Sequence, residues 1–299
     1  MTQEATRRRG DVAISRPEKL LWPQLPLTKQ GYADYLEAVS EHMLPWLRER
    51  PLTMVRAPDG VDGERYFQKA APTYAPGWVR TTRIPAPSAK RDVDYVVCQD
   101  ASTLRWLGNQ AVLEFHPAPV RRDRLDRPDL LVVDIDPPEG DFEAAVEVAF
   151  LVLEVLEDLS LPSGIKTTGG KGLHVISPIE RRVDQVALKR AAATLTGIAI
   201  GRRPDLVTDA FRKAGREGRV MLDPSRNGTG ATIVAPYSPR TRPEATVSFP
   251  VAPEELRSID PADFSVRTVA GLLDRAGPRR WRDLVHQRGR LPRRLLEAD

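Results

Sequence analysis

The amino-acid sequence predicts an α+β fold of mixed α/β character, in which a mixed, largely antiparallel sheet is flanked by helices. Two observations lead to this prediction. Strand-like apolar segments occur singly between helical segments along the chain. In addition, residues 164–177 (GIKTTGGKGLHVIS) contain two short strand-like runs around a glycine-rich turn, which is the pattern of a β-hairpin. A sheet that combines both kinds of connection is typical of mixed folds.

The first half of the chain begins with a predicted helix. Thr28 is expected to cap a helix over roughly 29–49, whose apolar residues recur on one face. Residues 71–92 contain four prolines, so they are predicted to form a long surface loop with little regular structure. The other elements predicted here are strands at 94–98 and 111–115 and a short helix near 100–109.

The second half contains the strongest strand and helix patterns. The apolar run LLVVDID (130–136) is predicted to be a buried strand that ends at Pro137 and Pro138, and 141–159 is predicted to be an amphipathic helix. The other elements predicted here are a helix at about 184–198, strands at 219–223 and 231–235, and a basic helical tail at about 268–299.

Composition limits the class of protein. The chain has 299 residues, of which 41% are hydrophobic and 29% charged, as in ordinary globular proteins. It contains neither a signal peptide nor an apolar run of the ~20 residues that cross a bilayer, so we expect no membrane partner and a cytoplasmic, nucleoid-associated protein. The single cysteine, Cys98, excludes an internal disulfide. A formal net charge of +4 slightly favours polyanionic partners.

Three aspartates end predicted apolar strands. Asp134 and Asp136 are two residues apart, so strand periodicity places both side chains on one face, and Asp223 ends the run RVML before a proline. Adjacent carboxylates repel each other, and a divalent cation such as Mg²⁺ or Mn²⁺ relieves that repulsion. Three such acids could hold two metal ions, as polymerases do. The alternatives are solvated or helix-capping acids, or the Asp-x-Asp of a glycosyltransferase.

The glycine-rich hairpin is a candidate phosphate site. Its glycines let the backbone approach a phosphate closely, and Thr168, Lys171 and His174 offer a hydroxyl, an ammonium and an imidazole. The alternative is an ordinary hairpin with a structural histidine, and the spacing is not that of a Walker A motif. Arg240 is a further candidate for contact with a triphosphate.

Four motifs in order, LVVDIDPP, GIKTTGGKGLHV, RVMLDPSRN and VAPYSPRTRP, resemble the polymerase domain of bacterial ligase D. That domain belongs to the archaeo-eukaryotic primase superfamily and serves non-homologous end joining. The resemblance runs from about Ile14 to about Leu256 and includes EKLLWP (18–23), RYFQK (65–69) and VLEFHP (112–117). It implies a flexible N-terminus over 1–13 and a single primase-polymerase-like catalytic domain over 14–299.

The resemblance also implies roles for individual residues. Two metal ions, Mn²⁺ or Mg²⁺, would be held by the three acids: Asp134, Asp136 and Asp223. The nucleotide would be bound by a basic and polar set: Thr168, Lys171, His174, His116, Arg216 and Arg240. Tyr66 and Phe67 would stack on the template, and Lys19 and Lys29 would bind a downstream 5′-phosphate. The sequence departs from the family where Tyr66 and Thr168 replace Phe and Ser, where Ala70 replaces a common His, and where Arg226 replaces Gln.

The function that follows is template-directed, metal-dependent nucleotide addition at gaps or DNA ends, with NTPs preferred to dNTPs, in double-strand break repair by non-homologous end joining. The partners implied are DNA with a 5′-phosphate, NTP or dNTP, Ku and a separate DNA ligase. The chain lacks a Lys-x-Asp-Gly motif, since the nearest string, 57–60, has no lysine. We therefore expect a polymerase that stands alone or was excised from a longer protein. The alternatives are a primase, a base-excision gap-filling polymerase, and a DNA-end bridging module whose polymerase activity is secondary.

Overall fold

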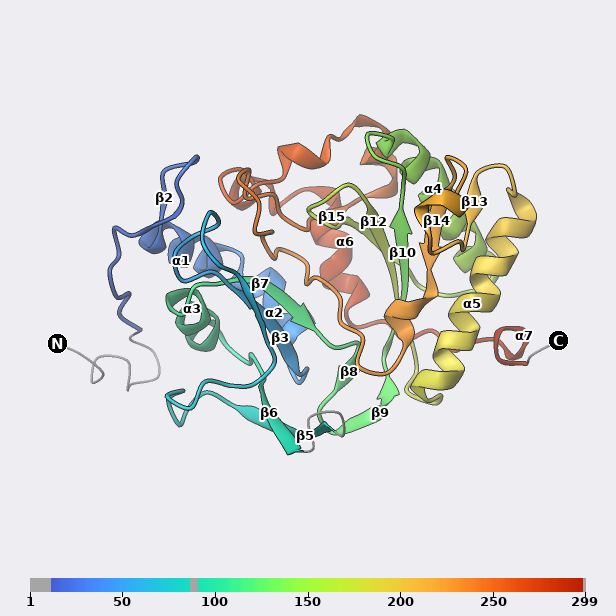
Figure 1. Cartoon of the computed structure of the whole chain (residues 1–299). Coiled ribbons are helices and arrows are strands. Elements are labelled where there is room, and N and C mark those ends of the chain that lie inside the picture. The colour runs from blue at the N-terminus through green and yellow to red at the C-terminus, as the bar shows by residue number, and fades with distance from the viewer. Residues whose placement is uncertain (1–11, 87–90, 298–299) are drawn as a thin grey trace. The chain divides into compact units, whose positions relative to one another are not determined.

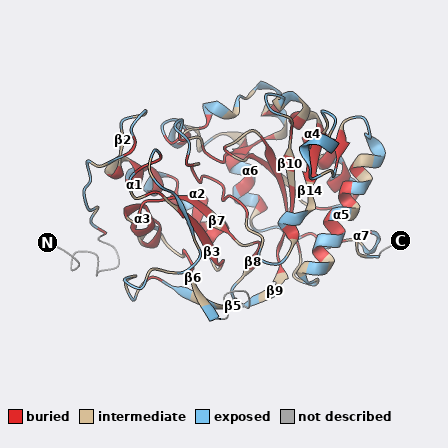
Figure 2. Ribbon diagram, viewed as in Figure 1, coloured by how far each residue is buried: buried red, intermediate tan, exposed pale blue. Residues whose placement is uncertain are grey.

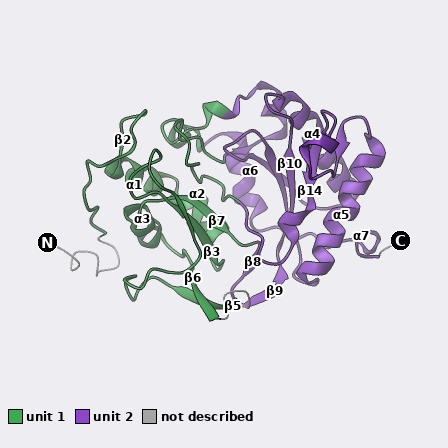
Figure 3. Ribbon diagram, viewed as in Figure 1, with its two compact units in different colours: residues 1–118, 234–248, 262–273 green, residues 119–233, 249–261, 274–299 purple. Residues whose placement is uncertain are grey.

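A computed structural model describes residues 12–86 and 91–297 (Figure 1). Most of the predicted flexible N-terminus, residues 1–13, therefore lies outside the described residues. The chain folds into two compact units (Figure 3). Unit 1 comprises residues 1–118, 234–248 and 262–273, and unit 2 comprises 119–233, 249–261 and 274–299. The expectation of one catalytic domain over 14–299 stays a prediction.

Unit 1 is built on an antiparallel sheet of order β4-β3-β6-β5, with β7 also paired to β3. The strands are β3 (Leu52–Arg56), β4 (Tyr66–Gln68), β5 (Thr81–Ala86), β6 (Arg91–Val96) and β7 (Val112–Pro117). A separate pair joins β1 (Leu20–Trp22) to β2 (Leu27–Thr28). The helices are α1 (Lys29–Ala38), α2 (Ser40–Leu47) and α3 (Ala101–Asn109), and a 3-10 turn covers Val269–Leu272.

Two predictions for unit 1 were wrong in part. Thr28 does cap α1, because its Oγ1 accepts a hydrogen bond from the Gly31 amide, but the predicted helix over 29–49 is divided at Val39. Pro45 lies inside α2 and has no N–H with which to continue a regular bonding pattern. The predicted loop over 71–92 contains β5 and the start of β6. Pro85, the proline within β5, is tolerated because β5 is an edge strand that, among the described residues, pairs only with β6.

Unit 2 contains a six-stranded sheet of order β13-β14-β10-β12-β11-β15. Only the β13–β14 pair is parallel, which confirms the mixed, largely antiparallel sheet. Its strands are β10 (Leu130–Asp136), β11 (Gly164–Thr167), β12 (Leu173–Pro178), β13 (Val207–Thr208), β14 (Val220–Asp223) and β15 (Pro250–Val251). A separate hairpin joins β8 (Val120–Arg121) to β9 (Arg124–Pro128). The strand predicted at 130–136 and the hairpin predicted at 164–177 are thus confirmed.

Two long helices cover one face of this sheet. They are α4 (Phe142–Asp158) and α5 (Gln185–Arg202), and α6 (Ala276–Leu284) and the short α7 (Arg293–Leu296) follow near the C-terminus. Leu131, Val133 and Ile135 of β10 share one buried apolar cluster with residues of α4 and α5. Figure 2 shows the result on α5, where buried and exposed residues alternate as expected for a helix with one packed face. The intervening side chains of β10 therefore lie on the opposite face of the sheet.

Other predictions for unit 2 were also corrected. Residues 231–235 form no strand; they run as irregular chain, although Ile233, Val234 and Ala235 are buried. Pro236, which follows them, has no N–H to donate to a strand partner. The basic tail is helical only over Val269–Leu272, α6 and α7, with irregular chain between them. No helix among the described residues is long and apolar enough to span a bilayer.

Candidate active site

A row of polar side chains crosses the sheet of unit 2. Asp223 of β14 is the register partner of Asp134 on β10, Asp134 is the partner of His174 on β12, and His174 is the partner of Lys166 on β11. Because register partners project from the same face of a sheet, the four side chains form one line of two carboxylates, an imidazole and an ammonium. Asp136 lies two residues further along β10, on the same face.

Asp134 is the centre of the row. Its Oδ1 lies 3.3 Å from His174 Nε2, and its Oδ2 accepts a 2.9 Å hydrogen bond from Arg226 Nε. Burial raises the pKa of Asp134, but the interactions with His174 and Arg226 outweigh burial and hold that pKa well below its usual range. Burial and the charge of Lys166 lower the pKa of His174 to about 4. His174 is therefore neutral at pH 7, and Arg226 is the cation that balances Asp134.

His174 has an unused hydrogen-bonding atom. Its side chain is almost fully buried, and its Nδ1 has no hydrogen-bond partner among the residues that the structure describes. Buried polar atoms are nearly always paired in folded proteins. An unpaired nitrogen on the imidazole that contacts Asp134 is therefore consistent with a site that is completed by a bound molecule.

Asp136 joins two of the predicted nucleotide-binding residues. Its Oδ1 lies 3.0 Å from Lys171 Nζ, and its Oδ2 lies 2.7 Å from Arg216 Nη1. Lys171 Nζ also donates a 2.7 Å hydrogen bond to the carbonyl of Pro137. The ammonium of the glycine-rich hairpin is thus held directly beside the acids.

The hairpin is packed tightly against β10. A Cβ atom at Gly172 would lie 2.3 Å from the carbonyl oxygen of Ile135, so only glycine fits there. Gly169 has a φ of 66°, in the left-handed region that favours glycine. Thr168 Oγ1 donates to the carbonyl of Gly172 and accepts from the Gly170 amide, which closes the turn.

Asp223 is held by its own loop. Its two carboxylate oxygens accept hydrogen bonds of 2.8 Å from the amide and the hydroxyl of Ser225, and it caps the 3-10 helix Pro224–Asn227. Asp223 is therefore both a capping residue, as the alternative interpretation expected, and a neighbour of Asp134 in the row.

The three acids are the correct type of ligand for Mg²⁺ or Mn²⁺, but they already have partners within the chain: three cations, the neutral His174 and Ser225. Among the residues that the structure describes, no group of three or more His, Cys, Asp or Glu side chains is already arranged to hold a metal ion. A metal ion at this site would have to displace Lys171, Arg216 or Arg226 from a carboxylate.

Other predicted residues lie in unit 1, where His116 and Arg240 share one carboxylate. Glu114 Oε2 lies 2.8 Å from His116 Nε2 and 3.1 Å from Arg240 Nε, while Oε1 accepts hydrogen bonds from the amide and hydroxyl of Thr241. Burial raises the pKa of Glu114, but these partners lower it to about 2. Sequence reasoning missed Glu114, although a charged residue within the apolar strand VLEFHP was a usable signal.

The predicted aromatic pair is exposed in unit 1. Tyr66 and Phe67 lie on β4, and the Phe67 side chain is 77% exposed. The Phe67 ring centroid lies 6.4 Å from that of His116. Neither ring therefore packs in the hydrophobic core.

The two predicted phosphate-binding lysines differ in environment. Lys19 Nζ forms a 2.7 Å ion pair with the exposed Asp59. Lys29 is buried, and its Nζ donates hydrogen bonds of 2.9 Å to the carbonyl and hydroxyl of Ser15. Burial, followed by the positive charges of Arg16, Lys19 and Arg56, lowers the pKa of Lys29 to about 8. The concentration of positive charge around Lys29 favours an anion there.

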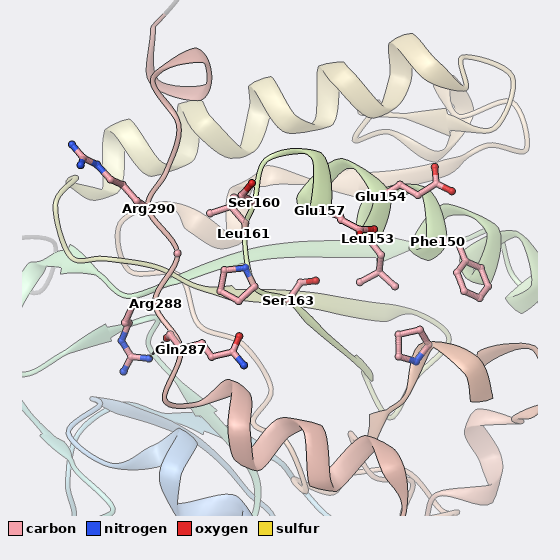
Figure 4. Close-up of a pocket in the computed structure, with 13 residues that line it drawn as sticks. Phe150, Leu153, Glu154, Glu157, Ser160, Leu161, Ser163, Gln287, Arg288 and Arg290 are labelled. Carbon is pink, nitrogen blue, oxygen red and sulfur yellow. Dashed lines mark hydrogen bonds between the residues drawn. The ribbon is translucent and has the colours of Figure 1, made fainter.

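Unit 2 also contains a cavity of about 900 Å³ (Figure 4). It lies between the C-terminal half of α4 and residues 287–290, with apolar side chains such as Leu153 and Leu161 and charged side chains such as Glu157 and Arg290 around it. The described residues that line it are distinct from the row and the hairpin, so it is not part of the candidate site.

A mixed sheet that carries strand-end acids beside a glycine-rich hairpin defines a nucleotidyltransferase of the polymerase type, and comparisons with known proteins agree. Residues 28–280 match the family model of the LigD primase-polymerase domain. The chain belongs to this family, and the predictions of the family, the fold class and the enzyme class are confirmed.

Individual relatives support the same assignment. The chain is 34% identical over 284 residues to the multifunctional non-homologous end joining protein LigD of Pseudomonas aeruginosa, covering 94% of this chain and 34% of that protein. It is 32% identical over 263 residues to the bifunctional non-homologous end joining protein LigD of Bacillus subtilis, covering 87% of this chain and 42% of that protein. The chain thus spans between a third and a half of the length of these relatives.

A solved structure is also similar. The polymerase domain of Mycobacterium tuberculosis ligase D, in complex with DNA, matches with a TM-score of 0.85 and 31% sequence identity, covering 93% of this chain and 99% of that one. The match confirms the fold class over nearly the whole chain. The roles of individual site residues remain predictions.

Proposed function

We propose that this chain adds nucleotides to the 3′ end of a DNA strand opposite a template, at gaps or ends that carry a 5′-phosphate, during non-homologous end joining. The observation that carries the proposal is the row across the sheet of unit 2. It brings Asp134 and Asp223 side by side, with Asp136 on the same face and the hairpin ammonium of Lys171 within 3.0 Å of Asp136. Acids next to phosphate-binding cations suit a metal–triphosphate substrate.

In this proposal, Asp134, Asp136 and Asp223 hold two Mn²⁺ or Mg²⁺ ions. Bound metal would lower the pKa of the 3′-hydroxyl and neutralise charge on the α-phosphate. Side chains of the protein bind and orient the nucleotide. Lys171 and Arg216, which now pair with Asp136, bind triphosphate oxygens when the substrate replaces that carboxylate as their partner. The neutral His174 orients Asp134 and offers its free Nδ1 to the substrate.

The residues of unit 1 contribute contacts to nucleotide and DNA. His116 and Arg240, oriented by Glu114, bind the nucleotide, and the exposed Phe67 with Tyr66 stacks on template bases. Lys19 and Lys29 bind the downstream 5′-phosphate. NTPs are preferred to dNTPs. The names of the relatives place those proteins in end joining, and we extend that role to this chain.

The experiment is primer extension on a gapped duplex, with and without a downstream 5′-phosphate, comparing NTP with dNTP and Mn²⁺ with Mg²⁺. We expect extension by the wild type, and less than a few per cent of it by Asp134→Asn. DNA affinity of that variant, measured by fluorescence anisotropy, should be nearly unchanged. Retained extension by Asp134→Asn would reject the metal assignment. Binding without extension by the wild type would favour a DNA-bridging module.

A further inference from the structure

The sheet of unit 2 is completed at one point by a side chain. Asn227 ends the 3-10 helix Pro224–Asn227 and is almost fully buried. Its Oδ1 accepts a 2.8 Å hydrogen bond from the Val132 amide, and its Nδ2 donates a 2.7 Å bond to the Val132 carbonyl. The side-chain amide of Asn227 therefore binds both backbone polar groups of one residue of β10, 95 positions away in the chain.

The register of the sheet explains why a side chain is needed there. Asp134 pairs with Asp223, the last residue of β14, so a continued strand would place Ser225 opposite Val132. Ser225 cannot bond to Val132, because its amide donates to the Asp223 carboxylate and its carbonyl accepts from a later amide of the same loop. Val132 is buried, and unpaired backbone groups inside a protein cost free energy. Asn227 supplies the donor and the acceptor that the missing strand residue would have offered.

The same amide is also bonded to the loop that follows the third acid. Asn227 Nδ2 donates a 3.2 Å hydrogen bond to the carbonyl of Pro224, the residue directly after Asp223. This loop also carries Arg226, whose Nε donates the 2.9 Å bond to Asp134 Oδ2. One buried side chain thus connects β10, two residues before Asp134, to the loop that carries Arg226 and begins at Asp223.

The connection matters because the strand pairing beside it is short. β14 pairs with β10 over the three residues Asp134–Asp136, and Asp223 lies at the end where this pairing stops. The end of a strand opens more easily than its middle. Asn227 provides the next pair of hydrogen bonds beyond Asp223, which opposes opening at that end.

We infer that Asn227 is a positioning residue, which holds Asp223 beside Asp134 so that the two carboxylates can bind a common metal ion. The inference rests on the proposed function for the role of the metal, but the placement of Asp223 can be tested without metal. Asn227 itself contacts neither metal nor substrate. Removing its amide should loosen Asp223 selectively and weaken metal binding through Asp223.

The first test is hydrogen–deuterium exchange of the metal-free protein, followed by mass spectrometry. Asn227→Ala leaves the Val132 amide without its acceptor, so exchange in segments 130–134 and 220–228 should become at least about tenfold faster. The other strands of unit 2 should be unchanged. Ser238→Ala is the matched control, because the Ser238 hydroxyl accepts a 2.9 Å bond from the buried amide of Phe115 in unit 1. This control removes the same kind of bond and should leave both segments unchanged.

The second test is the affinity for Mn²⁺ alone, measured from the electron paramagnetic resonance signal of the free ion. Loss of a residue that orients a metal ligand typically lowers metal affinity about 10- to 100-fold, so Asn227→Ala should bind Mn²⁺ roughly tenfold more weakly than wild type. A double-mutant cycle with Asp223→Asn assigns the loss. If Asn227 acts through Asp223, the double variant should bind Mn²⁺ no more weakly than Asp223→Asn alone. Ser238→Ala should bind Mn²⁺ as the wild type does.

A longer side chain separates positioning from general stability. Asn227→Gln keeps the amide but adds one methylene between the amide and the backbone, so the hydrogen bonds to Val132 can form only if the loop shifts. Its thermal unfolding should lie closer to that of the wild type, whereas its Mn²⁺ affinity should fall as in Asn227→Ala. If Asn227→Ala does not fold, Asn227→Gln takes its place in the double-mutant cycle. Wild-type Mn²⁺ affinity in folded Asn227→Gln would overturn the inference.

The outcomes separate this inference from the proposed function. Unchanged exchange in the two segments, or equal acceleration throughout unit 2, overturns the inference even if the wild type extends primers normally. Additive losses of Mn²⁺ affinity also overturn it, because Asn227 would then act independently of Asp223. If the wild type binds no Mn²⁺, the metal assignment of the proposed function fails and the exchange measurement decides alone. Selective opening of the two segments then supports the placement of Asp223 by Asn227.

Discussion

In the proposed function Lys29 binds the downstream 5′-phosphate, and its lowered pKa predicts that this recognition depends on pH. Burial and the neighbouring cations Arg16, Lys19 and Arg56 lower the pKa of Lys29 to about 8 from 10.5. The charged ammonium is therefore lost as pH rises through 8, whereas an ordinary lysine would stay charged at pH 9. A 5′-phosphate keeps its full charge throughout this range, because its second pKa is about 6. Recognition should consequently weaken above pH 8.

The magnitude follows from proton linkage. A bound phosphate raises the pKa of Lys29, so that the complex contains the charged form while the free protein loses it. With a free pKa of about 8, the affinity is divided by 1 + 10^(pH − pKa), which is about 1.1 at pH 7 and about 11 at pH 9. The preference for a 5′-phosphate over a 5′-hydroxyl should therefore fall roughly tenfold between these two pH values.

The assay is fluorescence anisotropy with gapped duplexes that differ only in the 5′ group, at fixed salt from pH 7 to 9. The 5′-hydroxyl duplex reports every other effect of pH, so the ratio of the two affinities isolates the phosphate. Lys29→Met should abolish both the preference and its pH dependence, and Lys29→Arg, if its larger side chain is accommodated, should remove only the pH dependence. A constant ratio in the wild type from pH 7 to 9 would refute the reasoning.

Three further substitutions test other parts of the site. Lys171→Ala should raise the KM for NTP by about tenfold, the effect of losing one charge-assisted hydrogen bond, and leave the affinity for gapped DNA unchanged. Steady-state kinetics measures the KM and fluorescence anisotropy measures the DNA affinity. A fall in DNA affinity with an unchanged KM would contradict the prediction. Arg226→Gln removes the cation 2.9 Å from Asp134. Mn²⁺ would then no longer have to displace this ion pair, which contributes about 1 kcal/mol because it is partly exposed. The Mn²⁺ concentration for half-maximal extension should therefore fall by roughly fivefold. A rise in that concentration would show that Arg226 assists metal binding. Glu114→Gln should lower the free energy of unfolding by about 2–3 kcal/mol and raise the KM for NTP, because Arg240 loses its buried counter-charge. Urea denaturation measures the first effect, and an unchanged KM in the folded variant would show that Glu114 does not orient the nucleotide site.

The elements that local patterns specify were predicted well. The strand at 130–136 was predicted with its observed bounds, because an uninterrupted apolar run meets two prolines that cannot continue it. The helix that follows was predicted to within one residue at each end, since Asp141 caps it and its apolar residues recur at helical spacing. The tight turn of the hairpin was evident from its glycines. In each case, the residues that determine the element lie within about twenty positions of one another in the sequence.

The features that depend on tertiary pairing could not be predicted in the same way. Nothing in the local sequence of 71–92 shows that β5 is an edge strand, which is the condition that makes its proline acceptable. Likewise, the ion pairs of Asp134 with Arg226 and of Asp136 with Arg216 join residues 92 and 80 positions apart. They form only because β14 pairs with β10 in one particular register, and that register is not encoded by any short motif.

The pairing of each active-site acid with a partner from its own chain has a consequence for how the site is filled. Asp134 and Asp136 already have arginine and lysine as internal counter-ions, so in the proposed function an arriving metal ion would exchange with them. Each ion that binds would release side-chain cations, and these would become available to the phosphates of a nucleotide. Metal and nucleotide would then each strengthen the binding of the other by the same factor, as thermodynamic reciprocity requires. The metal ions and the nucleotide would in this way bind together, and neither alone would bind tightly.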